Sequence, residues 1–244
     1  QMCIRDRSDD RKLRESAFRN VYKAYGSHNN TLGATLAGEV KKNVFNARTH
    51  HYNSARERAL SNNHIPEAVY DNLVKTVHKY LPLLHRYTKL RKELLGIEDL
   101  KMYDLYTPLV KDVKFDMPYE EAKSWMLKAL EPMGEEYLNV VKEGLDNRWV
   151  DVYENKGKRS GGYSSGAHLT NPFILLNWSD TVSDLYTLVH EFGHSAHSYF
   201  SRQNQPSNLS DYTIFVAEVA STCNEALLSD YMAVSYTHLT LPTS

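Results

Sequence analysis

Cysteine is almost absent from this sequence, which contains only Cys3 and Cys223 among its 244 residues. Two cysteines are too few for a disulfide framework, and residues 1–10 contain no apolar stretch of the kind that a secretory signal requires. We therefore expect a protein of a reducing, cytoplasmic compartment. Long hydrophobic runs are also missing: runs such as residues 173–176 are short, whereas a membrane-spanning helix needs about 18 apolar residues.

An excess of charge of either sign is missing too. The 29 Lys and Arg residues oppose 30 Asp and Glu residues, which leaves a net charge of -1. Proteins that bind nucleic acids or anionic membranes usually carry a basic excess. We therefore expect neither a nucleic-acid partner nor a membrane partner, and the sequence does not define an oligomeric state.

Helix-forming patterns dominate what is present. Hydrophobic residues make up 41% and charged residues 24%, as in an ordinary soluble globular protein. Residues 8–105 favour helices, and the longest of these is expected to begin at Pro66 and to end near Gly96. Two further helices are expected between Pro118 and Gly144, with a break at residues 132–134.

A small sheet is expected after these helices. Aromatic and β-branched residues favour strands at residues 148–153 and 172–178, joined by the glycine-rich turn of residues 156–166. This order predicts a small antiparallel sheet. The turn does not match a phosphate-binding GxxxxGK[ST] loop. It is either a flexible loop beside a strand edge that pairs with an extended peptide, or an ordinary hairpin turn.

The motif HExxH lies at residues 190–194, within an apolar pattern of helical period. His190 and His194 are four residues apart, so a helix places both imidazoles on one face. In such a motif the two histidines bind Zn²⁺, and the intervening Glu191 serves as the general base of peptide hydrolysis.

A third protein ligand completes such a zinc site. A metzincin would need Gly at position 197 and His at position 200, which are His197 and Phe200 here. The remaining class takes a Glu from a second helix downstream, and both Glu218 and Glu225 qualify by distance. These two glutamates are two helical turns apart on one face, so one can bind the metal while the other orients a ligand. His197 lies a turn too far along the helix to be a ligand.

Several longer phrases have a more specific resemblance. HEFGHSAH, YDLYTPL, GKRSGGY, NPFILLNW and FVAEVASTCNEALL resemble the active-site region of oligoendopeptidase F, in the thimet-oligopeptidase-like family of zinc metallopeptidases. The resemblance covers about residues 9–232. It implies a mainly α fold of the zincin type, with a small sheet beside the HExxH helix and a channel that admits short peptides.

The same resemblance assigns roles to residues. It implies one Zn²⁺ per chain, held by His190, His194 and Glu218, with Glu191 as the general base and Glu225 orienting a ligand. It also implies a strand edge for the substrate backbone, which residues 172–178 fit. We expect the peptide to be contacted by three residues in and after the glycine-rich turn: Tyr163, Gly166 and His168.

The chain also departs from the family in its length. Family members are longer, so the chain resembles an internal fragment, with a helical region at 8–105 and an incomplete zinc-binding part at 106–234. Residues 1–7 and 235–244 look foreign to the family. In the family, the Tyr and His side chains that polarise the scissile carbonyl follow the glutamate ligand, in a region this chain lacks. We therefore expect a zinc endopeptidase of low activity; the alternatives are a non-catalytic zinc- or peptide-binding helical module and a helical scaffold with an accidental HExxH.

Overall fold

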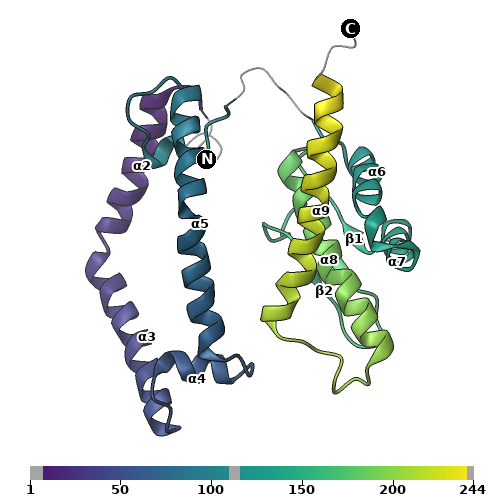
Figure 1. The fold of residues 1–244 in the computed structure, drawn as a ribbon, viewed down its shortest axis with the longest axis horizontal. Helices are drawn as coiled ribbons and strands as arrows, with labels where there is room; N and C mark the ends of the chain where they lie inside the picture. Colours follow the sequence, from purple (N-terminus) through teal and green to yellow (C-terminus); the bar gives the residue numbers. More distant parts are fainter. Residues whose placement is uncertain (1–7, 110–115, 241–244) are drawn as a thin grey trace. The chain divides into compact units, whose positions relative to one another are not determined.

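The computed structural model describes residues 8–109 and 116–240, with the side chains of 236–240 excepted. The chain divides into two compact units, Gln1–Val113 and Lys114–Ser244. Both are built mainly of helices (Figure 1). None of the helices in the described ranges is long and apolar enough to cross a membrane.

The first unit is wholly helical in its described part. Its elements are α2 (Arg11–Gly26), α3 (Asn29–Thr49), α4 (Ala55–Ser61), α5 (Glu67–Leu94) and the short 3₁₀ helix η1 (Met102–Asp104). The side chain of Asp10 accepts from backbone N–H groups at the start of α2, and that of Ser54 does so at the start of α4. Pro66 precedes α5, as the sequence predicts, because its fixed φ suits a helix start.

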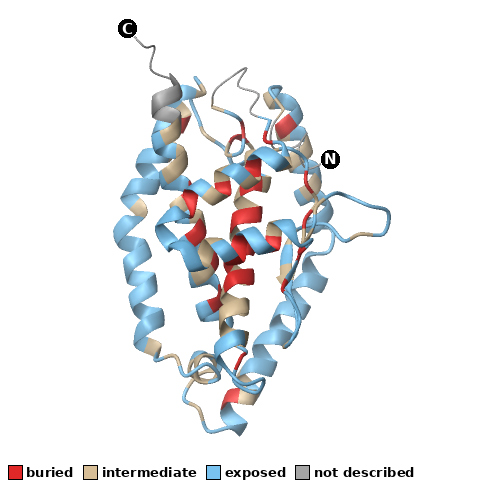
Figure 2. Ribbon diagram, turned by 90° about the vertical axis from the view of Figure 1, so that its right-hand side faces the viewer, coloured by how far each residue is buried: buried red, intermediate tan, exposed pale blue. Residues whose placement is uncertain are grey.

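A charged network, rather than an apolar core, holds the ends of this unit together. The side chain of Asp104 is fully buried and accepts from Arg11 and Arg14, each at 2.9 Å. Arg91 of α5 donates to the backbone oxygens of Asp104 and Thr107. The hydrophobic clusters found in the described residues all lie in the second unit. Accordingly, α3 and α5 are mostly exposed, whereas buried residues concentrate in the second unit (Figure 2).

Replacing Asp104 with Asn is expected to destabilise the first unit by about 3–5 kcal/mol, because it leaves the buried Arg14 without its counter-charge. Burial alone would raise the pKa of Asp104, but hydrogen bonds from Arg11 and Arg14 outweigh it and the pKa lies below its ordinary value. The carboxylate's contribution is therefore complete above the unfolded-state pKa of about 4 and is lost as the pH falls through the lower folded-state value.

Hydrogen exchange of residues 8–109 between pH 2 and pH 6 measures this contribution. The matched control is Asp99→Asn, since the carboxylate of Asp99 is exposed and, among the described residues, its ion pair is with Lys101 at the surface. Equal protection of the Asp104→Asn and Asp99→Asn variants at pH 6 would contradict the prediction.

The second unit contains the apolar core. Its elements are α6 (Tyr119–Ala129), η2 (Glu131–Met133), α7 (Glu135–Asp146), β1 (Val150–Asp151), β2 (Tyr163–Ser165), β3 (Phe173–Leu175), α8 (Val182–Asn204) and α9 (Ile214–Thr240). Helix α8 packs against α6, α7, α9 and two strands of the sheet. Its apolar side chains Leu185, Leu188 and Phe192 are buried at the centre of the largest cluster. The mainly helical class and a small sheet beside the HExxH helix are confirmed.

The sheet is mixed, so the prediction of an antiparallel sheet is wrong. Its strand order is β1-β3-β2, with β1 parallel to β3 and β2 antiparallel to β3. The segment taken as a glycine-rich turn itself forms β2, which reverses the chain before β3 begins. Because the chain reverses twice between β1 and β3, these two strands run in the same direction.

Two expectations about the termini are not tested. Residues 1–7 and 241–244 lie outside the described residues, and residues 235–240 continue the backbone of α9. That these ends are foreign to the family stays a prediction.

Candidate metal centre

Helix α8 carries the HExxH motif and is firmly anchored. Its first turn has a capping box, in which Thr181 accepts from the backbone of Asp184 and Asp184 accepts from the backbone of Thr181. One face of the helix is buried in the core, which leaves the two histidines partly exposed on another face. The helix thus presents His190 and His194 from a fixed position, one turn apart.

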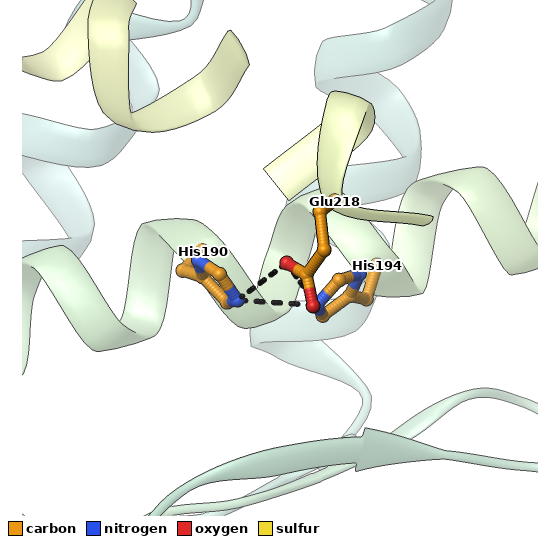
Figure 3. A group of neighbouring side chains, drawn as sticks. All are labelled: His190, His194 and Glu218. Atoms are coloured by element: carbon orange, nitrogen blue, oxygen red, sulfur yellow. Dashed lines mark hydrogen bonds and ion pairs between the residues drawn. The ribbon is translucent and has the colours of Figure 1, made fainter. Parts of the chain in front are cut away.

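Three ligand-type side chains converge at this face. One donor atom from each of His190, His194 and Glu218 can be chosen so that all lie within 4.8 Å of one another. The two Nε2 atoms are 3.1 Å apart. Oε2 of Glu218 lies 3.5 Å from Nε2 of His190 and 3.7 Å from Nε2 of His194. Figure 3 shows Glu218 reaching from α9 to the two imidazoles of α8.

The spacing of these atoms fits a tetrahedral zinc site. Ligand atoms about 2.0–2.1 Å from Zn²⁺ are separated by about 3.3 Å when the geometry is tetrahedral. The three observed separations, 3.1, 3.5 and 3.7 Å, bracket that value. Two imidazoles and one carboxylate also form the donor set of zinc hydrolases that keep a coordination position open.

The histidine rings are held in the form that binds a metal. Nδ1 of His190 donates to Oε1 of Glu225 at 2.5 Å, since a carboxylate can only accept. This bond places the lone pair of His190 on Nε2, which faces Glu218. Burial, aided by the neighbouring His190, lowers the pKa of His194, which favours the neutral ring. Glu225 and Glu218 thus approach opposite nitrogens of one imidazole.

Glu191 lies beside the cluster in an environment suited to a base. It is 6% exposed, and its Oε2 has no hydrogen-bond partner among the described residues. Burial raises its pKa, while the adjacent His190 and a hydrogen bond from the backbone of Ser164 act in the opposite direction. A carboxylate with a raised pKa is a stronger base than an exposed one.

A close crossing of two helices brings Glu218 to the histidines. A Cβ added at Gly193 would lie 2.6 Å from Cα of Ser221 and 2.8 Å from the carbonyl oxygen of Ala220. Only glycine therefore permits α9 to approach α8 this closely. Ser221 Oγ then donates to Oε2 of Glu218 at 2.9 Å, and this bond fixes the carboxylate that faces the imidazoles.

Two further contacts hold α9 in place. The fully buried Asn224 donates to the carbonyl oxygen of Val189 and accepts from the hydroxyl of Tyr137, so its amide ties α9 to both α8 and α7. Before α9 begins, the ring of Tyr212 stacks on His197 with centroids 3.8 Å apart. His197 therefore packs against the connection between α8 and α9 and is not part of the three-residue cluster.

The residues expected to bind substrate lie on and after β2. Tyr163 is exposed on the strand, the carbonyl of Gly166 accepts from Arg202, and His168 follows in a turn. Within the described ranges, no hydrogen bond or ion pair joins these three residues to His190, His194 or Glu218. The expectation that residues 172–178 supply the free edge is wrong, because β3 is paired on both sides and the edge strands are β1 and β2.

Sequence reasoning missed the residues that shape the site rather than line it. Gly193 had a recognisable signal, since a glycine inside a helical apolar pattern often marks a close packing contact. Ser221 lies three residues after Glu218, where a helix places its hydroxyl next to the carboxylate. Ser164 had no signal, because its position depends on the pairing of β2 with β3.

Comparisons with known proteins identify relatives of this chain. The model of peptidase family M3 matches residues 5–240. Oligopeptidase PepF of Bacillus subtilis is 63% identical over 92% of this chain and 34% of its own length. Group B oligopeptidase PepB of Streptococcus agalactiae is 52% identical over 91% of this chain and 37% of its own length.

A solved structure is similar as well. Oligoendopeptidase-F of Enterococcus faecium has a TM-score of 0.62 and 42% identity, over 94% of this chain and 33% of its own. The chain thus spans about a third of the length of these relatives. The resemblance read from the sequence is confirmed: the chain belongs to peptidase family M3.

Proposed function

We propose that this chain carries the zinc-binding centre of an endopeptidase that hydrolyses short peptides. The observation that carries the proposal is the cluster of His190, His194 and Glu218, with the buried carboxylate of Glu191 beside it. The names of the relatives, oligopeptidase and oligoendopeptidase, support peptides as substrates. We also propose a cytoplasmic location, where the exposed thiol of Cys223 stays reduced.

Each residue of the centre has a proposed role. His190, His194 and Glu218 would hold one Zn²⁺, which when bound supplies a Lewis acid for the peptide carbonyl. Glu191 accepts the proton of the attacking water and delivers it to the leaving amine. Glu225 fixes the ring of His190 through the hydrogen bond to Nδ1.

The substrate backbone is proposed to pair with the free edge of β2. An unpaired strand edge presents free N–H and C=O groups. An extended peptide can form hydrogen bonds with these groups and so add a further strand to the sheet. Tyr163 lies on this strand and Gly166 and His168 directly follow it, so these residues would contact the peptide. Nδ1 of His168 is buried and has no hydrogen-bond partner among the described residues.

The proposal assigns no carbonyl-polarising side chain within these 244 residues. Such groups each contribute about 10²–10³ in rate. We therefore propose that the chain by itself turns over peptides slowly, and metal content is the sharper primary readout.

The test is the zinc content of the purified chain and of its His194→Ala variant. We expect one Zn²⁺ per wild-type chain and an affinity at least about 100-fold weaker in the variant, since even residues behind the ligands change affinity by about 10–100-fold. His197→Ala is the matched control on the same helix and should retain zinc. Equal zinc in the His194→Ala and wild-type chains would contradict the ligand assignment.

A further inference from the structure

Glycines flank β2 on both sides, and the one at position 162 lets the start of this strand lie close to α8. A Cβ added at Gly162 would be 2.7 Å from Cγ2 of Thr187. A Cβ added at Gly166 would be 2.7 Å from Nη1 of Arg202, whose Nη2 donates to the carbonyl of Gly166 at 2.8 Å. A larger residue at position 162 would require the strand or the helix to move. At position 166 the guanidinium of Arg202 could move aside, and the backbone obstacles are the carbonyl oxygen of Asn171, at 2.9 Å, and Cα of Pro172, at 3.2 Å.

A hydroxyl pair joins the strand and the helix between these two ends. Oγ of Ser164 lies 2.8 Å from Oγ of Ser195, a residue of α8 that is fully buried. Alternate residues of a strand share one face, so Gly162, Ser164 and Gly166 all face α8. Ser195 is one helical turn from Glu191, so the hydroxyl pair lies on α8 close to the proposed base.

We propose that the Ser164–Ser195 hydroxyl pair is a positioning contact that fixes the free edge of β2 relative to Glu191 and the metal ligands. The inference rests on the proposed function, since it concerns the strand on which the substrate would lie. Gly162 allows the close approach, whereas the hydroxyl pair selects one register of the strand along the helix. A peptide paired with β2 would then hold its scissile carbonyl at a fixed distance from the carboxylate of Glu191.

We expect the Ser164–Ser195 hydroxyl pair to affect the alignment of a bound peptide rather than the folding of the chain. Losing one hydrogen bond is expected to raise the local opening equilibrium of β2 about five- to tenfold. The core behind α8 should remain packed. A peptide would still pair with the strand, but its carbonyl would be less well placed for attack. The effect should therefore fall on the rate of the chemical step more than on peptide affinity.

The first measurement is hydrogen exchange of the metal-free chain. Ser195→Ala and Ser164→Ala should each speed exchange of the amides at residues 163–165 about five- to tenfold, with no change in α8 or α9. The double variant should be no faster than either single variant, because one interaction is lost in all three. Ser165→Ala is the matched control, since Ser165 is exposed and lies on the opposite face of β2.

The second measurement uses Co²⁺ bound to the chain as a paramagnetic probe. The pseudocontact shifts of the amides at residues 163–165 should change in Ser195→Ala, whereas those of α9 should not. Unchanged shifts together with unchanged exchange in β2 would overturn the inference. Faster exchange throughout α8 and α9 would also overturn it, because the pair would then serve only stability. A chain that fails to bind Co²⁺ would count against the proposed metal centre, while the exchange result would still decide the positioning role.

Discussion

Replacing Glu191 with Gln is expected to lower peptide hydrolysis by about 10²–10⁴-fold, the usual contribution of a general base, while the zinc content stays unchanged. The amide has nearly the same shape as the carboxylate but cannot accept the proton of the attacking water. The side chain at position 191 is only 6% exposed, so bulk water cannot readily replace the carboxylate as proton acceptor. The Glu191→Gln variant should therefore keep the geometry of the site and its zinc content, but lose most of its peptide hydrolysis.

The rate is best measured in a chimera, because we expect slow turnover from the chain alone. In the chimera this chain replaces the matching segment of the Bacillus subtilis relative, to which it is 63% identical. Hydrolysis of a quenched fluorescent peptide is followed, with chelator-treated protein as the blank. Glu136→Gln, an exposed carboxylate of α7, is the control. Near-normal turnover by the Glu191→Gln chimera would show that another group is the base.

Replacing Gly193 with Ala is expected to weaken zinc binding about 10–100-fold without touching a ligand. The new Cβ would meet backbone atoms of Ser221 and Ala220 at 2.6 and 2.8 Å. Ordinary contacts between carbon atoms are about 3.5–4.0 Å, so the two helices must separate by about 1 Å. Metal and catalytic sites tolerate displacements of only about 0.5 Å. Glu218 would therefore move out of reach of the two imidazoles.

The same change should lower the free energy of unfolding of the metal-free chain by about 1–3 kcal/mol, as overpacking of a core does. Zinc titration and denaturant unfolding of the metal-free chain measure the two effects separately. Gly33→Ala is the matched control: Gly33 lies inside α3, and a Cβ there meets nothing within 4 Å. That control should be neutral or slightly stabilising. Undiminished zinc affinity in the Gly193→Ala chain would contradict the prediction. It would show that α8 and α9 can move apart at position 193 without displacing Glu218 from the two imidazoles.

The part of the site that the sequence predicts is the part that depends on local geometry. The spacing of His190 and His194 within a helical pattern is enough to place two imidazoles on one face. The two-turn spacing of Glu218 and Glu225 likewise predicts that they share a face, and the structure brings both to His190. Which of them faces Nε2 could not be read from spacing. It depends on the crossing of α8 and α9 at Gly193, a contact between residues distant in sequence.

The strands of the sheet could not be predicted in the same way from local sequence. Its strands have only two or three residues each, so no alternating pattern is long enough to reveal them. β2 in particular lies in a segment whose glycines and serines favour a turn. Its assignment as a strand depends on hydrogen bonds to β3, and these became visible only in the folded chain. The same pairing makes β2, and not β3, an edge strand.

The residues from His190 to Glu225 contain every group proposed to hold or orient the metal, all of them on α8 and α9. The entropic cost of closing a loop rises only with the logarithm of its length, and for a separation such as that of His190 and Glu218 it is about 3 kcal/mol. A metal that binds both residues offsets this cost in the folded chain. Zinc held by His190, His194 and Glu218 would therefore tie α8 to α9 and add its binding free energy to the stability of the folded chain.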